Sequence, residues 1–226
     1  MSGTFALVLE TSTPHASVAL AGPTGVLEQH GFCSDRNHNA LLFAPMQQLL
    51  QNTAQPVGLV LGGSGPGSYS GTRVGIAAAQ GVAIALACPA VAVPSVLAVP
   101  AAQNGAACLA IGDARRGSFW SVRVENFRLA GEPILCDAPG LEAVVAEAVR
   151  EGIAIFSFEP ATRFPLPPRL AEVVRLEVPD ATRLWQAWLQ SREEDRCRWS
   201  EQIPQPLYLR PPHITAAKRP NGTLGA

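Results

Sequence analysis

The sequence has few charged residues and no excess of either sign. Only 15% of its 226 residues are charged, and the formal net charge is −1 at pH 7. Lysine is nearly absent, so most of the positive charge is arginine. A protein that grips RNA alone usually has a basic face, because phosphate neutralisation supplies most non-specific affinity. The composition argues against binding through overall charge and leaves room only for a local basic patch.

The sequence also lacks the marks of secretion and of membrane insertion. Its five cysteines form no CxxC pair, and Cys88 and Cys108 stand in apolar runs. We therefore expect buried free thiols in a reducing compartment. The N-terminus has no basic stretch followed by an apolar core, and the longest apolar stretch, Ile76–Val99, is broken by polar, glycine and proline residues. These absences predict a cytoplasmic protein that does not span a membrane.

Motifs of several enzyme classes are missing. The loop Gly62–Gly71 has no Gly-Lys-Ser/Thr, and it departs from GxGxxG because Gly71 comes one residue late. There is no HExxH, GxSxG or SxxK pattern, and no cysteine with an evident histidine partner. His38 has no second histidine four residues on, which favours a capping or surface role over a metal ligand.

Apolar periodicity predicts an α/β protein that opens with a β-meander. We expect strands at Phe5–Glu10, His15–Ala21, Val26–Cys33 and Val57–Leu61, and helices at 37–52, capped by Asp35 or Asn37, and at Ser70–Ala87. Pro45 should kink the first helix or mark the end of its early turns. The second helix is rich in glycine and alanine, so another backbone can approach it closely. A helix that is apolar on several sides is usually buried on more than one face, and a partner chain can supply part of that burial.

The pattern restarts near residue 107. Cys108–Asp113 resembles Phe5–Glu10 as a strand that ends in an acid, and Ser118–Glu125 returns as a strand. This repeat predicts two related lobes, which we place at residues 1–100 and 101–226, with the tail packing back on the first lobe. Later elements are expected as a helix at Gly140–Glu151, a strand at Ile153–Phe158, a loop at Pro160–Pro168, a strand at Leu170–Val178, a helix from the Asp180 cap to about Glu194, and an irregular tail from Pro204.

Three groups of residues each allow two interpretations. The glycine-rich loop Gly62–Gly71 is either a tight connection that lets a helix pack closely on the sheet, or an anion cradle at a helix N-terminus. Glu10 and Asp113 are either turn caps or acids that organise a metal and a nucleotide. Arg115 and Arg116 are either solvated turn residues or phosphate contacts.

Four stretches resemble the bacterial TsaB/YeaZ family and occur in its order. They are Ala6–Thr13 with Ala16–Leu20, Gly65–Gly75, Ile111–Gly117 and Pro206–Arg210. The resemblance covers nearly the whole chain and implies an actin/hexokinase-like (ribonuclease H-like) fold, with two related lobes of mixed β-sheets flanked by helices. It also implies a role in transferring a threonylcarbamoyl group to the adenosine beside the tRNA anticodon.

The resemblance further implies that this chain is a scaffold rather than the catalyst. In the family, transfer is run by a longer paralogue, TsaD, assisted by the ATPase TsaE, and pairing uses the first-lobe helices. The paralogue holds its metal with Asn-His-x-x-x-His, and Ser95 and Val99 stand where its two histidines would be. Valine cannot ligate a metal, so we expect no catalytic residue and no metal ligand here. We also expect a homodimer when the chain is alone, and contact with tRNA only through the complex.

Two sets of site residues follow from this resemblance. We expect the partner interface to draw on Leu41, Ala44, Pro45, Gln48, Arg73, Ala77, Gln80, Gly81 and Ile84. We expect any ATP or ADP to be shared with the partner rather than held by this chain alone, near Gly65, Pro66, Gly67, Ser68 and Arg73. The rivals are a small sugar or acetate-type kinase of the same fold, and a metallopeptidase, which the missing histidine pair disfavours.

Overall fold

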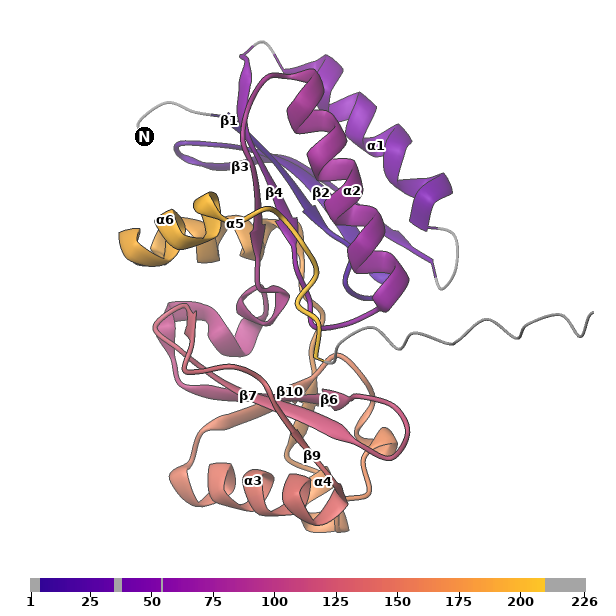
Figure 1. Cartoon of the computed structure of the whole chain (residues 1–226), viewed down its shortest axis with the longest axis vertical. Coiled ribbons are helices and arrows are strands. Elements are labelled where there is room, and N and C mark those ends of the chain that lie inside the picture. The colour runs from indigo at the N-terminus through magenta and orange to yellow at the C-terminus, as the bar shows by residue number, and fades with distance from the viewer. Residues whose placement is uncertain (1–4, 35–37, 54, 210–226) are drawn as a thin grey trace, which may run out of the picture.

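The computed structural model describes residues 5–34, 38–53 and 55–209, which form two α/β lobes stacked one above the other (Figure 1). The first lobe contains β1 (Phe5–Glu10), β2 (His15–Gly22), β3 (Gly25–Cys33), α1 (His38–Asn52), β4 (Val57–Gly63), α2 (Tyr69–Ala85) and β5 (Ala90–Val93). The second contains β6 (Cys108–Asp113), β7 (Phe119–Glu125), β8 (Arg128–Leu129), β9 (Ile134–Cys136), α3 (Ala138–Glu151), β10 (Ala154–Ser157), α4 (Pro168–Ala171) and β11 (Val174–Leu176). Two last helices, α5 (Ala181–Gln190) and α6 (Glu193–Glu201), follow.

The two sheets share one topology. The first has the order β3-β2-β1-β4-β5, and the second has the order β11-β10-β6-β7-β8, with β9 also paired to β7. In each, a central strand, β1 or β6, pairs antiparallel with the next strand and parallel with a later one. The predicted α/β fold with two related lobes of mixed sheets is therefore confirmed.

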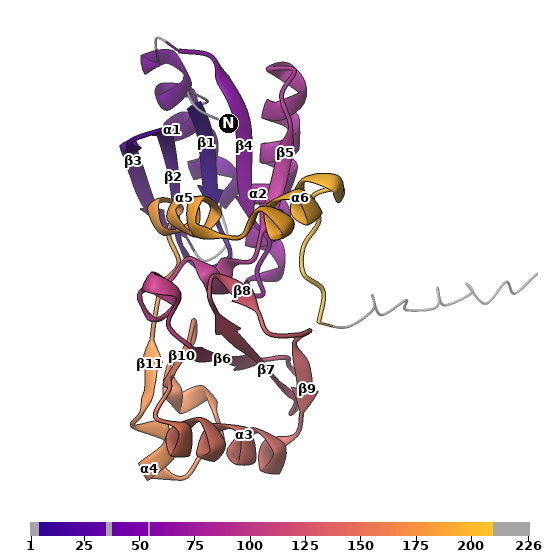
Figure 2. The same ribbon diagram turned by 90° about the vertical axis from the view of Figure 1, so that its left-hand side faces the viewer.

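Helices cover both faces of the first sheet. On one face, α1 and α2 pack over it, and Leu42, Met46 and Leu49 of α1 turn inward at helical spacing. On the other face, α5 and α6 cross the strands, as Figure 2 shows. The core on that side continues into the second sheet, which α3 covers from below. The helices α5 and α6 thus complete the core of the first lobe.

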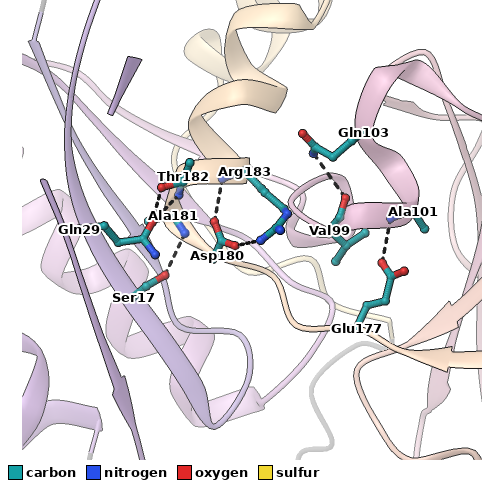
Figure 3. A network of polar contacts seen from close by, with 10 residues as sticks. All are labelled: Ser17, Gln29, Val99, Ala101, Gln103, Glu177, Asp180, Ala181, Thr182 and Arg183. Atoms are coloured by element: carbon teal, nitrogen blue, oxygen red, sulfur yellow. Dashed lines mark hydrogen bonds and ion pairs between the residues drawn. The ribbon is translucent and has the colours of Figure 1, made fainter. Parts of the chain in front are cut away.

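A network of hydrogen bonds fastens this crossing (Figure 3). The amide of Ala181 donates to Ser17 Oγ over 2.9 Å, and the amide of Thr182 donates to Gln29 Oε1 over 3.0 Å. Asp180 caps α5 by accepting from the amide of Arg183 over 2.8 Å. On the neighbouring connection, which contains the 3₁₀ turns Ser95–Leu97 and Pro100–Gly105, the amide of Ala101 donates to Glu177 Oε2 over 2.9 Å. Both segments that join the lobes are held by side chains.

Several predicted elements need correction. Leu170–Val178 is not one strand, because Pro167 and Pro168 start the short helix α4 and only Val174–Leu176 is extended. The helix capped by Asp180 ends at Gln190 rather than near Glu194, since Ser191 is extended and a new helix begins at Glu193. The helix α1 continues through Pro45, and the predicted caps Asp35 and Asn37 lie outside the described residues.

The cysteines differ from expectation in burial. All five are free, as predicted, but Cys108 alone is fully buried, whereas Cys33 and Cys197 are exposed. Burial raises the pKa of the Cys108 thiol to about 12, which makes it an inert core residue. Within the described ranges, no helix is both long and apolar enough to cross a membrane.

Candidate functional site

The glycine-rich loop joins β4 to α2 and uses many of its amides inside the protein. The amide of Ser64 donates to the Val93 carbonyl over 2.8 Å, and the amide of Gly65 donates to Ser95 Oγ over 3.0 Å. The amide of Ser68 donates to the Ser12 carbonyl over 2.6 Å. The loop is therefore fastened to the β1–β2 turn and to the start of the connection after β5.

Its glycines allow this close approach. A Cβ added at Gly71 would stand 2.2 Å from the Thr11 carbonyl oxygen, and one at Gly75 would stand 2.1 Å from Thr11 Oγ1. One at Gly67 would stand 2.3 Å from the Ser12 carbonyl oxygen. These distances are far below a van der Waals contact, so the glycines let loop and helix lie directly on the turn. Close packing accounts for them, and the nucleotide contact at Gly65, Pro66, Gly67, Ser68 and Arg73 stays a prediction.

Glu10 lies beneath this loop and is fully buried. Its Oε1 accepts from the amide of Ser12 over 2.7 Å, while its Oε2 makes no hydrogen bond of ordinary geometry to any described residue. Burial raises the pKa of Glu10 above its ordinary value, and hydrogen bonding to Ser12 and Ser95 offsets part of that rise. Glycine is required at position 63 too, because a Cβ added there would stand 2.0 Å from Glu10 Oε2. The Glu10 carboxyl is thus buried beneath the glycine-rich loop, in contact with Ser12 and Gly63.

Ser95 and Val99 are fully buried positions of the connection between the lobes. Ser95 Oγ is occupied by the amide of Gly65, and the side chain of Val99 has no atom that ligates a metal. Among residues 5–34, 38–53 and 55–209, no three histidine, cysteine or acidic side chains gather as a metal site would require. The side chain of His38 lies outside the described residues.

The predicted interface residues belong to α1 and α2, the two helices that Figure 1 shows side by side over one face of the first sheet. Of the nine, Pro45 and Gln80 are partly buried and the other seven are exposed. Ile84, at 81%, is the most exposed large apolar side chain among the residues that the structure describes. Phe43 and Tyr69, 55% and 64% exposed, belong to the same two helices but were not predicted. For Tyr69 the signal was available, because it is a large ring at the start of a helix made mostly of small residues.

The last described segment of the tail, which we expected to pack back on the first lobe, lies along α2. Gln80 Nε2 donates to the Pro204 carbonyl over 3.0 Å, and the amide of Leu207 donates to the Ser64 carbonyl over 2.8 Å. The rings of Tyr69 and Tyr208 lie 6.4 Å apart between centroids. The flank of α2 next to its exposed face is thus formed by residues more than 120 positions away.

The equivalent turn of the second lobe, between β6 and β7, is built differently. Asp113 Oδ2 accepts from Arg163 over 2.8 Å and from Arg115 over 3.4 Å. The amide of Asp113 donates to Glu159 Oε2 over 2.8 Å. Asp113 is therefore an anchor for two arginines, whereas its counterpart Glu10 is buried beneath a loop.

Comparisons with known proteins agree with this arrangement. The family model of TsaD, tRNA N6-adenosine threonylcarbamoyltransferase, matches residues 32–167. The Escherichia coli tRNA threonylcarbamoyladenosine biosynthesis protein TsaB is 31% identical over 123 residues, 51% of this chain, and the match spans about half (53%) of that relative.

Solved structures match over almost the whole chain. A Pseudomonas aeruginosa protein with similarity to peptidase YEAZ has a TM-score of 0.67 at 25% identity, covering 93% of this chain and 100% of the other. YeaZ from Pseudomonas aeruginosa has a TM-score of 0.64 at 24% identity, covering 92% and 100%, and it supports the fold alone. Because the family model covers more than half of the residues, the chain belongs to the TsaD family of tRNA N6-adenosine threonylcarbamoyltransferase, within which it resembles the TsaB and YeaZ proteins.

Proposed function

We propose that this chain is a non-catalytic subunit in the synthesis of threonylcarbamoyladenosine on tRNA. In this proposal it docks the catalytic paralogue TsaD, works with the ATPase TsaE, and supports transfer of the threonylcarbamoyl group to the adenosine beside the anticodon. The family description and the name of the Escherichia coli relative support the pathway. The free thiols fit a reducing compartment such as the cytoplasm.

The exposed face of α1 and α2 is the observation that carries the docking role. Phe43, Tyr69 and Ile84 are all more than half exposed there, whereas side chains of this kind are normally buried. Fully burying one of them against a partner is worth about 1.5–3 kcal/mol. Exposed apolar side chains on the surface of a protein are typical of interfaces when they gather in one patch. Small residues, including Ala77 and Gly81, lie exposed on α2, so a partner helix can approach its backbone closely.

The connection between the lobes supports a non-catalytic role. At the two positions where the catalytic paralogue has metal-binding histidines, Ser95 and Val99 are instead buried parts of the core. Creating a metal site there would require replacing packed side chains, not only reorienting them.

Reconstitution tests the proposal. We would combine the chain with TsaD, TsaE, the enzyme that supplies the threonylcarbamoyl adenylate, ATP and unmodified tRNA, and count modified adenosine by mass spectrometry of nuclease digests. Omitting this chain should abolish modification, and the chain alone should produce none. Unchanged modification without the chain would reject the proposal, and ATP turnover by the pure chain would instead support the kinase alternative.

An interface variant links the assay to the α1–α2 face. Replacing Ile84→Glu places a charge in the docking surface and should weaken pairing with TsaD. A loss of roughly 1.4 kcal/mol in pairing free energy weakens the complex tenfold. We therefore expect modification to fall at least tenfold. The matched control is Leu176→Glu on β11, which is also exposed but lies in the second lobe. Equal loss in both variants would mean that the face is not the interface.

The same face predicts a homodimer of the chain alone. Without a larger partner, two copies can bury their α1–α2 faces against each other around a two-fold axis. Light scattering should give a dimer mass that depends on concentration and becomes monomeric in Ile84→Glu. A monomer mass for the parent at all concentrations would contradict this expectation.

A further inference from the structure

We propose that the turn between β6 and β7 contacts the phosphate backbone of RNA. The proposal rests on the proposed function, because that function brings tRNA to the complex. It goes further by assigning a direct contact to this chain, at Arg115, Arg116 and Arg163.

The backbone of the turn is unfavourable for the residues it carries. Arg115, Arg116 and Gly117 have φ angles of +66°, +57° and +70°. Side chains other than glycine rarely adopt this region, because Cβ then crowds the following carbonyl. The turn is closed by hydrogen bonds between Ala114 and Ser118 and from the Ser118 amide to the Arg115 carbonyl, over 2.9 and 3.2 Å. The stability of the turn therefore does not account for two arginines at these positions.

Two guanidinium groups near this turn share a single carboxylate. Elsewhere among the described residues, three ion pairs join one arginine to one acid: Arg150 with Glu147, Arg183 with Asp180 and Arg198 with Asp195. Here Asp113 anchors both Arg115 and Arg163. Each guanidinium has five N–H donors, so one carboxylate leaves most of them free to meet a further anion.

Arg116 adds an unpaired charge beside this anchored pair. It is exposed, and it forms no ion pair with any residue in the described ranges. The printed hydrogen bonds of the turn involve two acids, Asp113 and Glu159, so the three arginines exceed these acids by one positive charge. This excess is small but local, in a chain whose net charge is −1.

The backbone of the turn offers donors of the same kind. Among the described residues, the amides of Arg116 and Gly117 donate to no acceptor, whereas the amide of Arg115 is taken by Asp113 Oδ1 over 2.6 Å. Successive free N–H groups in a turn form a concave donor set that suits an anion. Planar guanidinium groups match phosphate oxygens in pairs, which favours a phosphodiester over a diffuse negative surface.

The position of the turn suits RNA held by a partner. In Figure 1 it lies on the same side of the molecule as α1 and α2, at the level of the second lobe. A substrate carried by a subunit docked on those helices would therefore pass close to it.

The first test measures tRNA binding by the assembled complex as a function of salt. We would titrate the complex with labelled tRNA by fluorescence anisotropy, from about 50 to 200 mM salt, where phosphate contacts lose much of their affinity. The slope of log K against log salt is negative, and Arg116→Gly should make it shallower by about 0.7–0.9, because one phosphate contact is lost. Arg116→Lys, which keeps the charge, should restore most of the slope.

A matched control separates the turn from general charge. Arg192 is exposed and forms no ion pair within the described residues, and it lies just before α6, which Figure 1 shows on the opposite side of the molecule from the turn. Arg192→Gly should leave the slope unchanged. Arg116→Gly should melt no lower than the parent, because glycine suits the positive φ. An unchanged slope in Arg116→Gly, or an equal loss in Arg192→Gly, would overturn the proposal.

A second arm separates this inference from the proposed function. The isolated chain would be titrated at about 50 mM salt with a labelled RNA hairpin shaped as an anticodon arm. If the complex does not assemble, the proposed function fails, while weaker binding by the isolated Arg116→Gly chain still supports the RNA contact. If ATP occupies the turn and the hairpin cannot displace it, the site takes free nucleotide phosphate and the proposal is wrong. It is also wrong if an acidic peptide of equal charge competes as well as the hairpin.

Discussion

The two lobes build the same strand–turn–strand unit and finish it in opposite ways. In the first lobe, the turn after β1 is roofed by the glycine-rich loop, and its acid, Glu10, is fully buried. In the second lobe, the turn after β6 stays open, and its acid, Asp113, holds two exposed arginines. The topology is therefore common to both, and the covering of the turn decides whether an acid becomes part of the core or part of a surface.

The largest effect is expected from disrupting the packing of the glycine-rich loop against the turn after β1. Gly71→Ala puts a methyl group 2.2 Å from the Thr11 carbonyl oxygen, where backbone must move. We expect a loss of about 3 kcal/mol in the free energy of unfolding, at the upper end for an overpacked core. Urea unfolding measures it. Gly81→Ala is the control, because nothing lies within 4 Å of its added Cβ, and it should stabilise the exposed helix position by about 0.5–1 kcal/mol. Similar values for both variants would mean that the loop is not tightly packed.

The second test is the pH dependence of the buried acid. Burial raises the pKa of Glu10, with a smaller contribution in the same direction from Asp180, so the folded state binds the proton more tightly than the unfolded state does. The stabilisation is fully present below the ordinary value of 4.5 and is lost as the pH rises through the folded pKa. Glu10→Gln mimics the protonated form, and its melting temperature should fall less than that of the parent between pH 4.5 and 8. The exposed Glu132→Gln should follow the parent, and parallel curves for all three proteins would contradict the assignment.

The smallest test relaxes the open turn. Arg116→Gly replaces a residue at φ +57° by one that adopts this angle freely, so we expect a gain of about 1 kcal/mol or less in unfolding free energy. Chemical denaturation checks the sign. A loss of stability would show that the arginine side chain supports the turn, and the contrast between the roofed and open turns would weaken accordingly.

Periodicity and turn residues were enough to predict most of the architecture. The opening meander, the helices near 38–52 and 69–85, and the repeat from Glu10 to Asp113 came from local patterns that the structure confirms. Elements too short for a period were missed, since β8 has two residues and β9 has three. The strand expected at Leu170–Val178 failed because a proline pair starts a helical turn just before it.

The sites divide in the same way. The glycine-rich loop could be recognised from one stretch of sequence. Its glycines are needed because the loop packs against the Thr11–Ser12 turn, which lies some sixty residues earlier. The contact of Gln80 with Pro204 and the sharing of Asp113 by Arg115 and Arg163 join distant parts of the chain. A local pattern carries no information about such pairs, so only the folded chain reveals them.

The placement of α5 also constrains how the protein is made. During synthesis, the strands of the first lobe leave the ribosome early, but the helix that covers one face of their sheet comes more than 160 residues after Ser17, which holds its first turn. Until α5 is synthesised, the apolar face that it covers stays exposed. The first lobe is therefore completed only after the whole second lobe has been made. A fragment ending near residue 100 would keep that face uncovered, so we expect the first lobe to be a unit of structure but not an independent unit of folding.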